Sequence, residues 1–185
     1  MSVPGVARGR RAFFAPVWLV ILAAIAVASL GLLARQLQST ATFIVVRHAE
    51  RDPGMDPDPP LNAAGRARAD RLASLLGEQG LGRPIGAIFV SDTRRARDTA
   101  EPLARSLRLT PTALKGSDVS QLLKRARAQA AVGPVLIVGH SNTIPQIVRG
   151  LVDVPVFTIT ENEFDAVFII VRPRFGPHSV VTLRY

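Results

Sequence analysis

The chain has 185 residues and a mass of 19.9 kDa, enough for one ordinary domain, and its 48% hydrophobic content excludes a disordered protein. It contains no cysteine, which excludes a disulfide framework, a thiolate zinc site and a cysteine nucleophile. The 23 basic and 14 acidic residues give a formal charge of +9, and 21 of the basic residues are arginines, which bind phosphate bidentately. This composition favours anionic partners, although charge alone identifies no ligand.

The first predicted element is an apolar helix near the N-terminus. An uncharged stretch of 23 residues runs from Ala12 to Ala34, and at ~1.5 Å per residue it reaches roughly 34 Å, the thickness of a bilayer core. We expect a transmembrane helix at 12–34 that anchors the chain in a lipid bilayer, with a cleavable signal peptide as the alternative. Arg8, Arg10 and Arg11 precede this stretch, whereas only Arg35 follows it closely. This bias predicts a single-pass membrane protein whose N-terminus is cytoplasmic and whose C-terminal domain is periplasmic or on the cell surface.

Short β-branched runs and helical patterns alternate further along the chain. Three apolar runs without alternation are typical of strands buried on both faces, at Thr42–Val46, Ile85–Val90 and Val135–Val138. Apolar residues at helical spacing lie between these runs, beginning after the predicted N-cap Asn62. Strands that alternate with helices predict an α/β sheet.

The chain ends in two further β-branched runs, at 166–171 and 179–185, which flank a Pro/Gly-containing turn. The expected fold is therefore an α/β three-layer sandwich: a mostly parallel central sheet flanked by helices, with a C-terminal β-hairpin, preceded by one transmembrane helix. The predicted organisation is a basic segment at 1–11, the transmembrane helix at 12–34, a linker at 35–41 and one catalytic-type domain at 42–185.

Each of the first three predicted strands runs directly into polar residues. RHAE follows the first strand at 47–50, SDTRR the second at 91–95, and GHSN the third at 139–142. In open α/β sheets, ligands bind outside the carboxyl ends of the strands, where helix N-termini add N–H donors. A single histidine after a strand commonly bonds a loop, but two at equivalent positions beside arginines indicate one shared site.

These motifs resemble those of the histidine phosphatase superfamily, which also contains the cofactor-dependent phosphoglycerate mutases. RHAE at 47–50, SDTRRARDT at 91–99 and VGHSNT at 138–143 stand in the family's order, and the similarity extends over 42–185. The family pattern S-x-x-x-R-A-x-x-T aligns the phosphate-binding arginine with Arg95 and not with Arg94. The resemblance is closest to the short bacterial phosphatases of the superfamily.

The resemblance implies that His48 attacks phosphorus to give a phosphohistidine, while Arg47, Arg95 and His140 surround the phosphoryl oxygens. Fixed guanidinium groups supply positioning and charge neutralisation without a metal, so neither a metal nor another cofactor is expected. His48 must be neutral to attack, whereas a protonated His140 would act as one more oxygen clamp. The implied activity is that of a metal-independent acid-type phosphomonoesterase. Its expected partner is a phosphorylated small molecule or a phosphoprotein, nucleic acid is not expected, and no oligomeric state is predicted.

The group that protonates the leaving alcohol is less well defined by the sequence. In the family this acid lies on a loop after the helix that carries the second arginine, and there the chain offers Asp118, although many members have Glu. Asp118 also fits a capping box and is equally well explained as an N-cap. Glu50 is the other candidate, or else it orients an arginine. Asn142 is expected either to contact phosphate or to cap the helix that follows it.

Other functions can be built from the same residues. Phosphoglycerate mutase-type transfer is the first alternative, but the domain has little room for the insertions that enclose a second phosphate. A non-catalytic module would bind phosphorylated ligands through the same arginines. A hydrolase with Ser141 as nucleophile is the least favoured, because Thr143 stands where a nucleophile elbow needs glycine, although Asp165 and His178 follow in the right order. Loops 51–60 and 109–118 are expected to form the pocket walls.

Overall fold

The computed structural model describes residues 17–37, 40–77 and 82–185, and the chain divides into two compact units between Gln38 and Ser39. In the first unit the structure describes helix α1 (Val17–Leu37). Across the described ranges, no helix is both long enough and apolar enough to span a membrane. The predicted transmembrane helix at 12–34, of which residues 12–16 lie outside the described ranges, is therefore wrong. The predicted single-pass membrane location with an external domain is wrong with it, and a lipid bilayer as partner is not shown.

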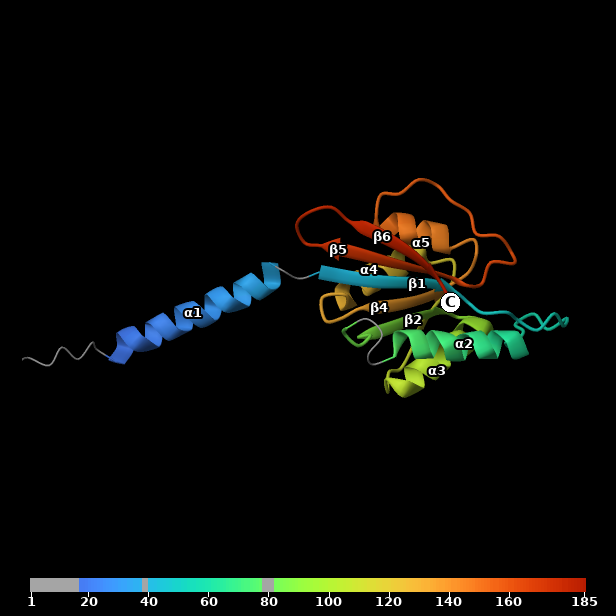
Figure 1. The fold of residues 1–185 in the computed structure, drawn as a ribbon, viewed down its shortest axis with the longest axis horizontal. Helices are drawn as coiled ribbons and strands as arrows, with labels where there is room; N and C mark the ends of the chain where they lie inside the picture. The colour runs from blue at the N-terminus through green and yellow to red at the C-terminus, as the bar shows by residue number, and fades with distance from the viewer. Residues whose placement is uncertain (1–16, 38–39, 78–81) are drawn as a thin grey trace, which may run out of the picture. The chain divides into compact units, whose positions relative to one another are not determined.

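A six-stranded mixed sheet forms the centre of the second unit, with the strand order β3-β2-β4-β1-β5-β6 (Figure 1). The strands are β1 (Thr40–Arg47), β2 (Ala87–Ser91), β3 (Thr112–Leu114), β4 (Val135–Gly139), β5 (Ala166–Pro173) and β6 (Ser179–Arg184). The pairings of β1 with β4, β2 with β4 and β2 with β3 are parallel, whereas β5 runs antiparallel to both β1 and β6. The carboxyl ends of β1, β2 and β4 therefore lie together at one end of the sheet.

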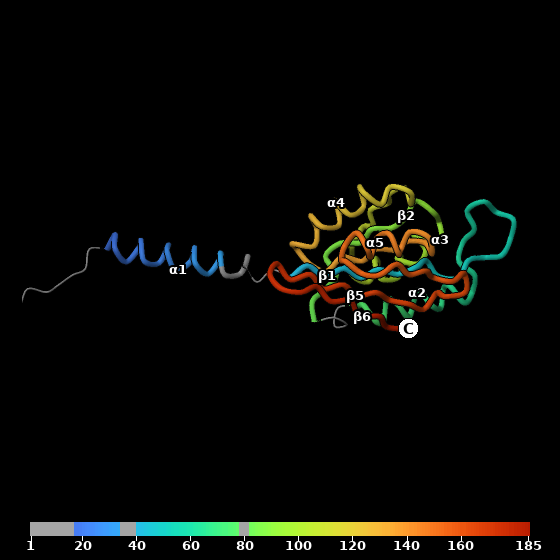
Figure 2. Tube along the Cα trace, turned by 90° about the horizontal axis from the view of Figure 1, so that it is seen from above, coloured from blue at the N-terminus to red at the C-terminus, as the bar shows by residue number. Residues whose placement is uncertain are grey.

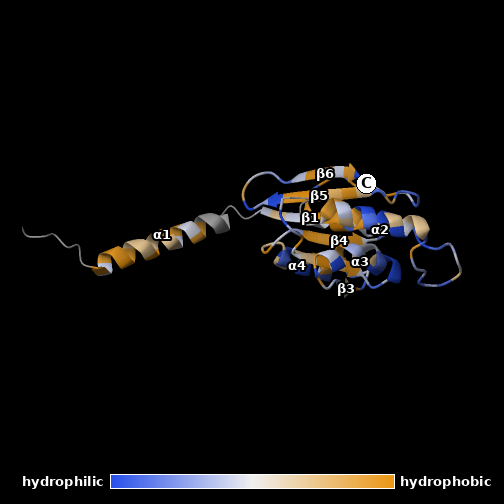
Figure 3. Cartoon of the chain, turned by 60° about the horizontal axis from the view of Figure 1, so that its bottom comes forward, coloured by the Kyte–Doolittle hydropathy of each residue, from blue (hydrophilic) through white to orange (hydrophobic). Residues whose placement is uncertain are grey.

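Two helices pack on each face of this sheet, and Figure 2 shows helices on both sides of the strands. They are α2 (Ala63–Leu76) and α3 (Arg94–Ser106) on one face, and α4 (Val119–Gln129) and α5 (Ile144–Leu151) on the other. The strands are apolar and the helices carry hydrophilic residues on their outer sides (Figure 3). The predicted α/β fold with flanking helices is confirmed, and β5 and β6 form the C-terminal hairpin at the edge of the sheet.

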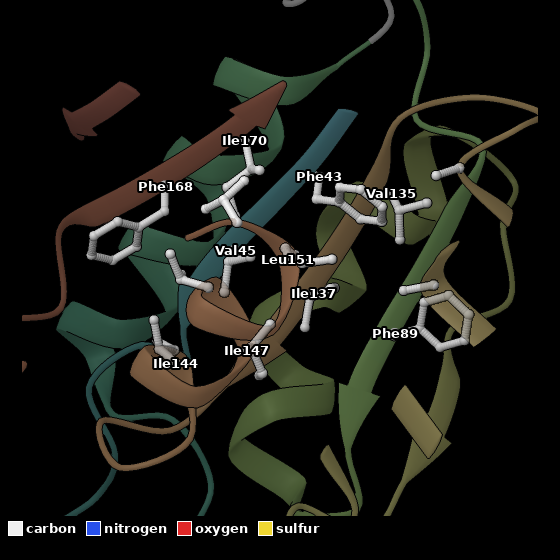
Figure 4. Packing of buried hydrophobic residues seen from close by; sticks show 14 of the residues in the cluster. Phe43, Val45, Phe89, Val135, Ile137, Ile144, Ile147, Leu151, Phe168 and Ile170 are labelled. Atoms are coloured by element: carbon white, nitrogen blue, oxygen red, sulfur yellow. The ribbon is translucent and has the colours of Figure 1, made fainter. Parts of the chain in front are cut away.

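The central strand β1 is buried on both faces, which explains its lack of alternation in sequence. Ile44 and Val46 pack with the residues of α2 and α3, whereas Phe43 and Val45 pack with those of α4 and α5 (Figure 4). All four side chains are at most 1% exposed. This packing holds the end of β1, and the residues that follow it, in a fixed place.

Two local features determine how the chain passes the carboxyl end of β1. Asn62 caps α2, as expected, by accepting a hydrogen bond of 2.8 Å from the backbone N–H of Gly65. A Cβ at Gly65 would lie 2.1 Å from the carbonyl oxygen of Glu50, so only glycine fits at this close approach of the two segments.

The predicted loop at 109–118 contains the three-residue strand β3, whose short sequence Thr-Ala-Leu shows no strand pattern.

Candidate active site

The register between β1 and β4 places two histidines side by side. Arg47 pairs with Gly139 across the two parallel strands, and the backbone N–H of His48 donates to the Gly139 carbonyl at 2.9 Å. The next residues, His48 and His140, therefore leave adjacent strands at the same level. Their ring centroids are 5.1 Å apart and the rings meet edge to face at 66°.

Hydrogen bonds fix the tautomer of His48. Its Nδ1 atom lies 2.8 Å from the carbonyl oxygen of Ala49, which can only accept, so Nδ1 carries the proton. Its Nε2 atom accepts a hydrogen bond of 3.2 Å from Nε of Arg95. The lone pair of the imidazole is therefore on Nε2, and an arginine that can also bind an anion lies beside it. Only 5% of His48 is exposed.

The N-terminal turn of α3 brings Arg95 to this imidazole. The hydroxyl of Thr99 donates to the Arg95 carbonyl at 2.7 Å and accepts from the Ala49 N–H at 2.9 Å, so it links the helix to the turn after β1. Asp58 caps the helix from the Pro-rich loop, because both of its carboxylate oxygens lie 2.9 Å from the Arg94 N–H. Asp58 also lies 3.6 Å from the NH1 atom of Arg95.

Arg47 is held by the segment that precedes β5. Its NH1 atom donates to the carbonyl oxygens of Thr160 and Glu161 at 2.9 Å and of Glu163 at 3.3 Å. Its NH2 atom donates to the Glu161 carboxylate at 3.1 Å, and its guanidinium lies 4.1 Å from the centroid of the Phe164 ring. Within the described part of the chain, its buried Nε has no hydrogen-bond partner. Arg47 therefore retains one unused donor.

A hollow of about 470 Å³ opens at this end of the sheet. Its lining joins residues from the ends of β1 and β4, from the start of α3, and from two loops. They are His48, Arg51, Asp56, Pro57, Pro59, Arg95, His140, Ser141, Asn142 and Glu161. The expected loop 51–60 contributes to its wall, and the segment before β5 contributes Glu161. The three residues His48, Arg95 and His140 share this cavity.

Both histidines at the site are neutral at neutral pH. Burial lowers the pKa of His48 to about 3; the Ala49 hydrogen bond acts in the opposite direction, and the nearby His140, Arg95 and Arg47 add to the lowering. Burial also lowers the pKa of His140 to about 4, with the charges of Arg95 and Arg47 acting in the same direction. The neutral form of His48 has its lone pair on Nε2, where it accepts the hydrogen bond from Arg95. A bound dianion would oppose these effects at both rings.

Several predicted site residues do not join this group. Glu50 forms hydrogen bonds of 2.6 to 3.0 Å with Arg68 of α2, and these bonds lower the pKa of its carboxyl group. Asp118 caps α4 by accepting a 3.0 Å hydrogen bond from the Gln121 N–H. Neither carboxylate lines the cavity. Asn142 does line it, and the N-cap of α5 is Thr143.

The residues of the alternative serine hydrolase are dispersed. The hydroxyl of Ser141 donates to the Glu161 carboxylate at 2.9 Å. Asp165 pairs with Arg184 at 2.6 Å. His178 lies in a hollow beside the start of β1, whereas Ser141 lies beyond the carboxyl ends of the strands. The described residues also contain no group of three His, Asp or Glu side chains arranged to hold a metal ion.

Sequence reasoning missed Glu161, Phe164 and Asp58. Glu161 and Phe164 lie in a segment without periodicity, between α5 and β5. The order and direction of the strands could have indicated this segment, because a strand antiparallel to β1 must start near the carboxyl end of β1. The segment that leads into that strand therefore reaches the site. Asp58 had no comparable signal in its Pro-rich loop.

Comparison with known proteins agrees with this geometry. Residues 43–118 match the family model of the histidine phosphatase superfamily, branch 1. This match covers less than half of the chain, and the fold is similar to that of a solved protein histidine phosphatase. A search of curated proteins found no match to the chain, whereas many solved structures match it at the same significance threshold.

Three of these structures illustrate the likeness. The protein histidine phosphatase SixA complexed with tungstate is 20% identical, with 77% of this chain and 96% of that chain covered and a TM-score of 0.62. Mycobacterial hydrolase 1 is 15% identical, with coverages of 77% and 96% and a TM-score of 0.59. A mycobacterial glucosyl-3-phosphoglycerate phosphatase in complex with VO3 is 17% identical, with coverages of 78% and 98% and a TM-score of 0.55. Identities this low show the fold alone.

Proposed function

We propose that this chain is a phosphomonoesterase that hydrolyses a phosphorylated substrate through a phosphohistidine intermediate on His48, without a metal. The observation that supports the proposal is the protonation and position of the His48 imidazole. Its Nδ1 proton is held by the Ala49 carbonyl, and its Nε2 lone pair lies beside Arg95 in a cavity shared with His140. A neutral, oriented nucleophile next to a fixed cation is what attack on a phosphoryl group requires.

The surrounding donors suit the three phosphoryl oxygens. Arg95 offers a guanidinium that is held at the start of α3, and His140 offers a ring N–H from the adjacent strand. Arg47 does not line the cavity, but its charge acts on both histidines that do. Preorganised donors of this kind stabilise the charge that develops in the transition state. A phosphoryl group bound there would also raise the pKa of His140 and favour its protonated form.

The solved structures support an oxyanion site, because two of the similar proteins were crystallised with tungstate and with VO3, which resemble phosphate. One of them is described as a protein histidine phosphatase and the other as a glucosyl-3-phosphoglycerate phosphatase. We therefore propose a phosphoprotein or a phosphorylated small molecule as substrate. Superfamily members are phosphatases or mutases, and we favour hydrolysis because the domain is short.

The test is hydrolysis of p-nitrophenyl phosphate by the 185-residue chain, with and without a chelator. We expect turnover that the chelator does not change and that His48→Ala abolishes. The matched control is His178→Ala, which removes a histidine away from the cavity and should leave the rate within about twofold. Quenching with alkali during turnover should trap a phosphoryl group on wild-type protein and none on His48→Ala, because phosphohistidine is hydrolysed in acid but persists in base. A substantially active His48→Ala protein would refute the nucleophile, and tungstate binding without any turnover would indicate a non-catalytic module.

A further inference from the structure

The proposed reaction needs a carboxylate that none of the expected residues supplies. An alkoxide leaving group must take a proton, and the attacking water of the second step must lose one. Asp118 is committed to the N-terminus of α4 and Glu50 to Arg68, and both lie outside the cavity lining. Among the described residues, the carboxylates that line the cavity are those of Asp56 and Glu161.

The contacts of these two carboxylates differ. Asp56 accepts a hydrogen bond of 2.9 Å from the Asp58 N–H, which closes a turn of its own loop. Glu161 instead contacts the site itself, because one oxygen accepts from Ser141, the neighbour of His140, and the other from Arg47, the neighbour of His48. Its side chain is 82% exposed, so it can turn toward a bound ligand without disturbing the packed core.

We propose that Glu161 is the proton-transfer residue of this site, an inference that rests on the proposed phosphatase function. In the first step a bond forms between Nε2 of His48 and phosphorus. The bond between phosphorus and the ester oxygen breaks, and that oxygen takes its electron pair and the proton of Glu161. In the second step water attacks phosphorus and gives a proton to Glu161. The bond between phosphorus and Nε2 then breaks, its electron pair returns to Nε2, and phosphate leaves.

The contacts of Glu161 explain how substrate binding would lead to protonation of its carboxylate. In the free protein, the hydrogen bond from Ser141 and the charge of Arg47 lower the pKa of Glu161. A bound phosphoryl dianion attracts Arg47 and places negative charge beside Glu161. Both changes favour its protonated form. The same arginine thus links occupation of the cavity to the protonation of the carboxylate.

The test compares two substrates that differ in their need for a proton. p-Nitrophenolate leaves unprotonated, whereas the alkoxide of glycerol 2-phosphate does not. In single-turnover experiments, Glu161→Gln should slow release of glycerol by about 100-fold or more, the usual contribution of a general acid. Release of p-nitrophenolate in the first turnover should stay within about threefold. Phosphohistidine should then accumulate with p-nitrophenyl phosphate, because the second step lacks its base.

Two variants with the same change of charge serve as controls. Asp56→Asn alters the other carboxylate of the cavity lining, and Glu163→Gln alters the same segment at a residue whose carboxylate pairs with Arg184. Glu163→Gln should act on the two substrates alike and stay within about twofold of wild type, whereas Asp56→Asn tests whether the other carboxylate of the cavity lining transfers the proton. Equal losses on both substrates with Glu161→Gln would overturn the inference and leave a structural role through Arg47. A loss confined to glycerol 2-phosphate with Asp56→Asn would move the role to that residue. If the wild-type chain hydrolyses neither substrate, the proposed function itself fails.

Discussion

Two regions of the candidate site are held in different ways. The floor, His48, Arg95 and His140, is fixed by the register of β1 with β4 and by hydrogen bonds from buried groups such as Thr99. The rim, residues 51–60 and 160–164, is held largely by ionic and polar contacts of more exposed side chains, including Glu161. A rigid floor suits the phosphoryl chemistry, which depends on preorganised charge. An adjustable rim suits proton transfer and substrate selection.

The largest expected effect comes from breaking the floor. Arg95→Ala removes the donor that contacts Nε2 of His48 and a cation in the cavity, and should lower kcat/KM for p-nitrophenyl phosphate by 10²- to 10³-fold, a typical loss for one preorganised donor. Arg94→Ala is the matched control, since the Arg94 side chain pairs with Asp98 and does not line the cavity. It should stay within about twofold. Equal losses in the two variants would show that Arg95 acts only through the helix.

The floor could be predicted from the sequence because its physical causes are local. Apolar runs without alternation identify strands buried on both faces, and polar residues directly after them must lie at the carboxyl edge of the sheet. The resemblance to the family pattern selected Arg95 over Arg94, and the structure places Arg95 against His48. The hydroxyl of Thr99 shows why the motif ends in threonine, because it joins α3 to the turn after β1.

Loop 51–60 of the rim was expected to form a pocket wall, but the part of the rim at 160–164 could not be predicted in the same way. Glu161 reaches the cavity through the path of a segment that has no secondary structure, and that path depends on how β5 pairs with β1. The sequence could not show whether Asp118 is a general acid or an N-cap, because aspartate is common in both roles. The apolar stretch at 12–34 shows that hydropathy alone did not predict this region correctly. It predicted a transmembrane helix, but the described helix is not long and apolar enough to span a membrane.

An intermediate effect is expected where the rim supports the floor. Asp58→Ala removes the cap of α3 and the charge beside Arg95, and should lower kcat/KM by about tenfold. It should also lower the free energy of unfolding by about 1 kcal/mol, the usual cost of a lost N-cap. Asp58→Asn keeps a capping oxygen and should recover most of the stability. Asp52→Ala, in the same loop, is the control for both measurements, because the Asp52 carboxylate accepts a hydrogen bond from the Gly54 N–H of its own loop. A wild-type kcat/KM in Asp58→Ala would show that the floor needs no support from the rim.

The smallest expected effect is the response of the floor to mild acid. Because burial and neighbouring cations lower the pKa of His48 to about 3 and of His140 to about 4, neither ring gains a proton between pH 7 and pH 5. In NMR spectra assigned with His48→Ala and His140→Ala, the two ring Cε1–H resonances should therefore stay nearly constant across this range. Arg95→Ala removes a charge that lowers both pKa values, so it should raise both midpoints. A midpoint near the ordinary histidine value of about 6.5 for either wild-type ring would show that the floor is open to water and as adjustable as the rim.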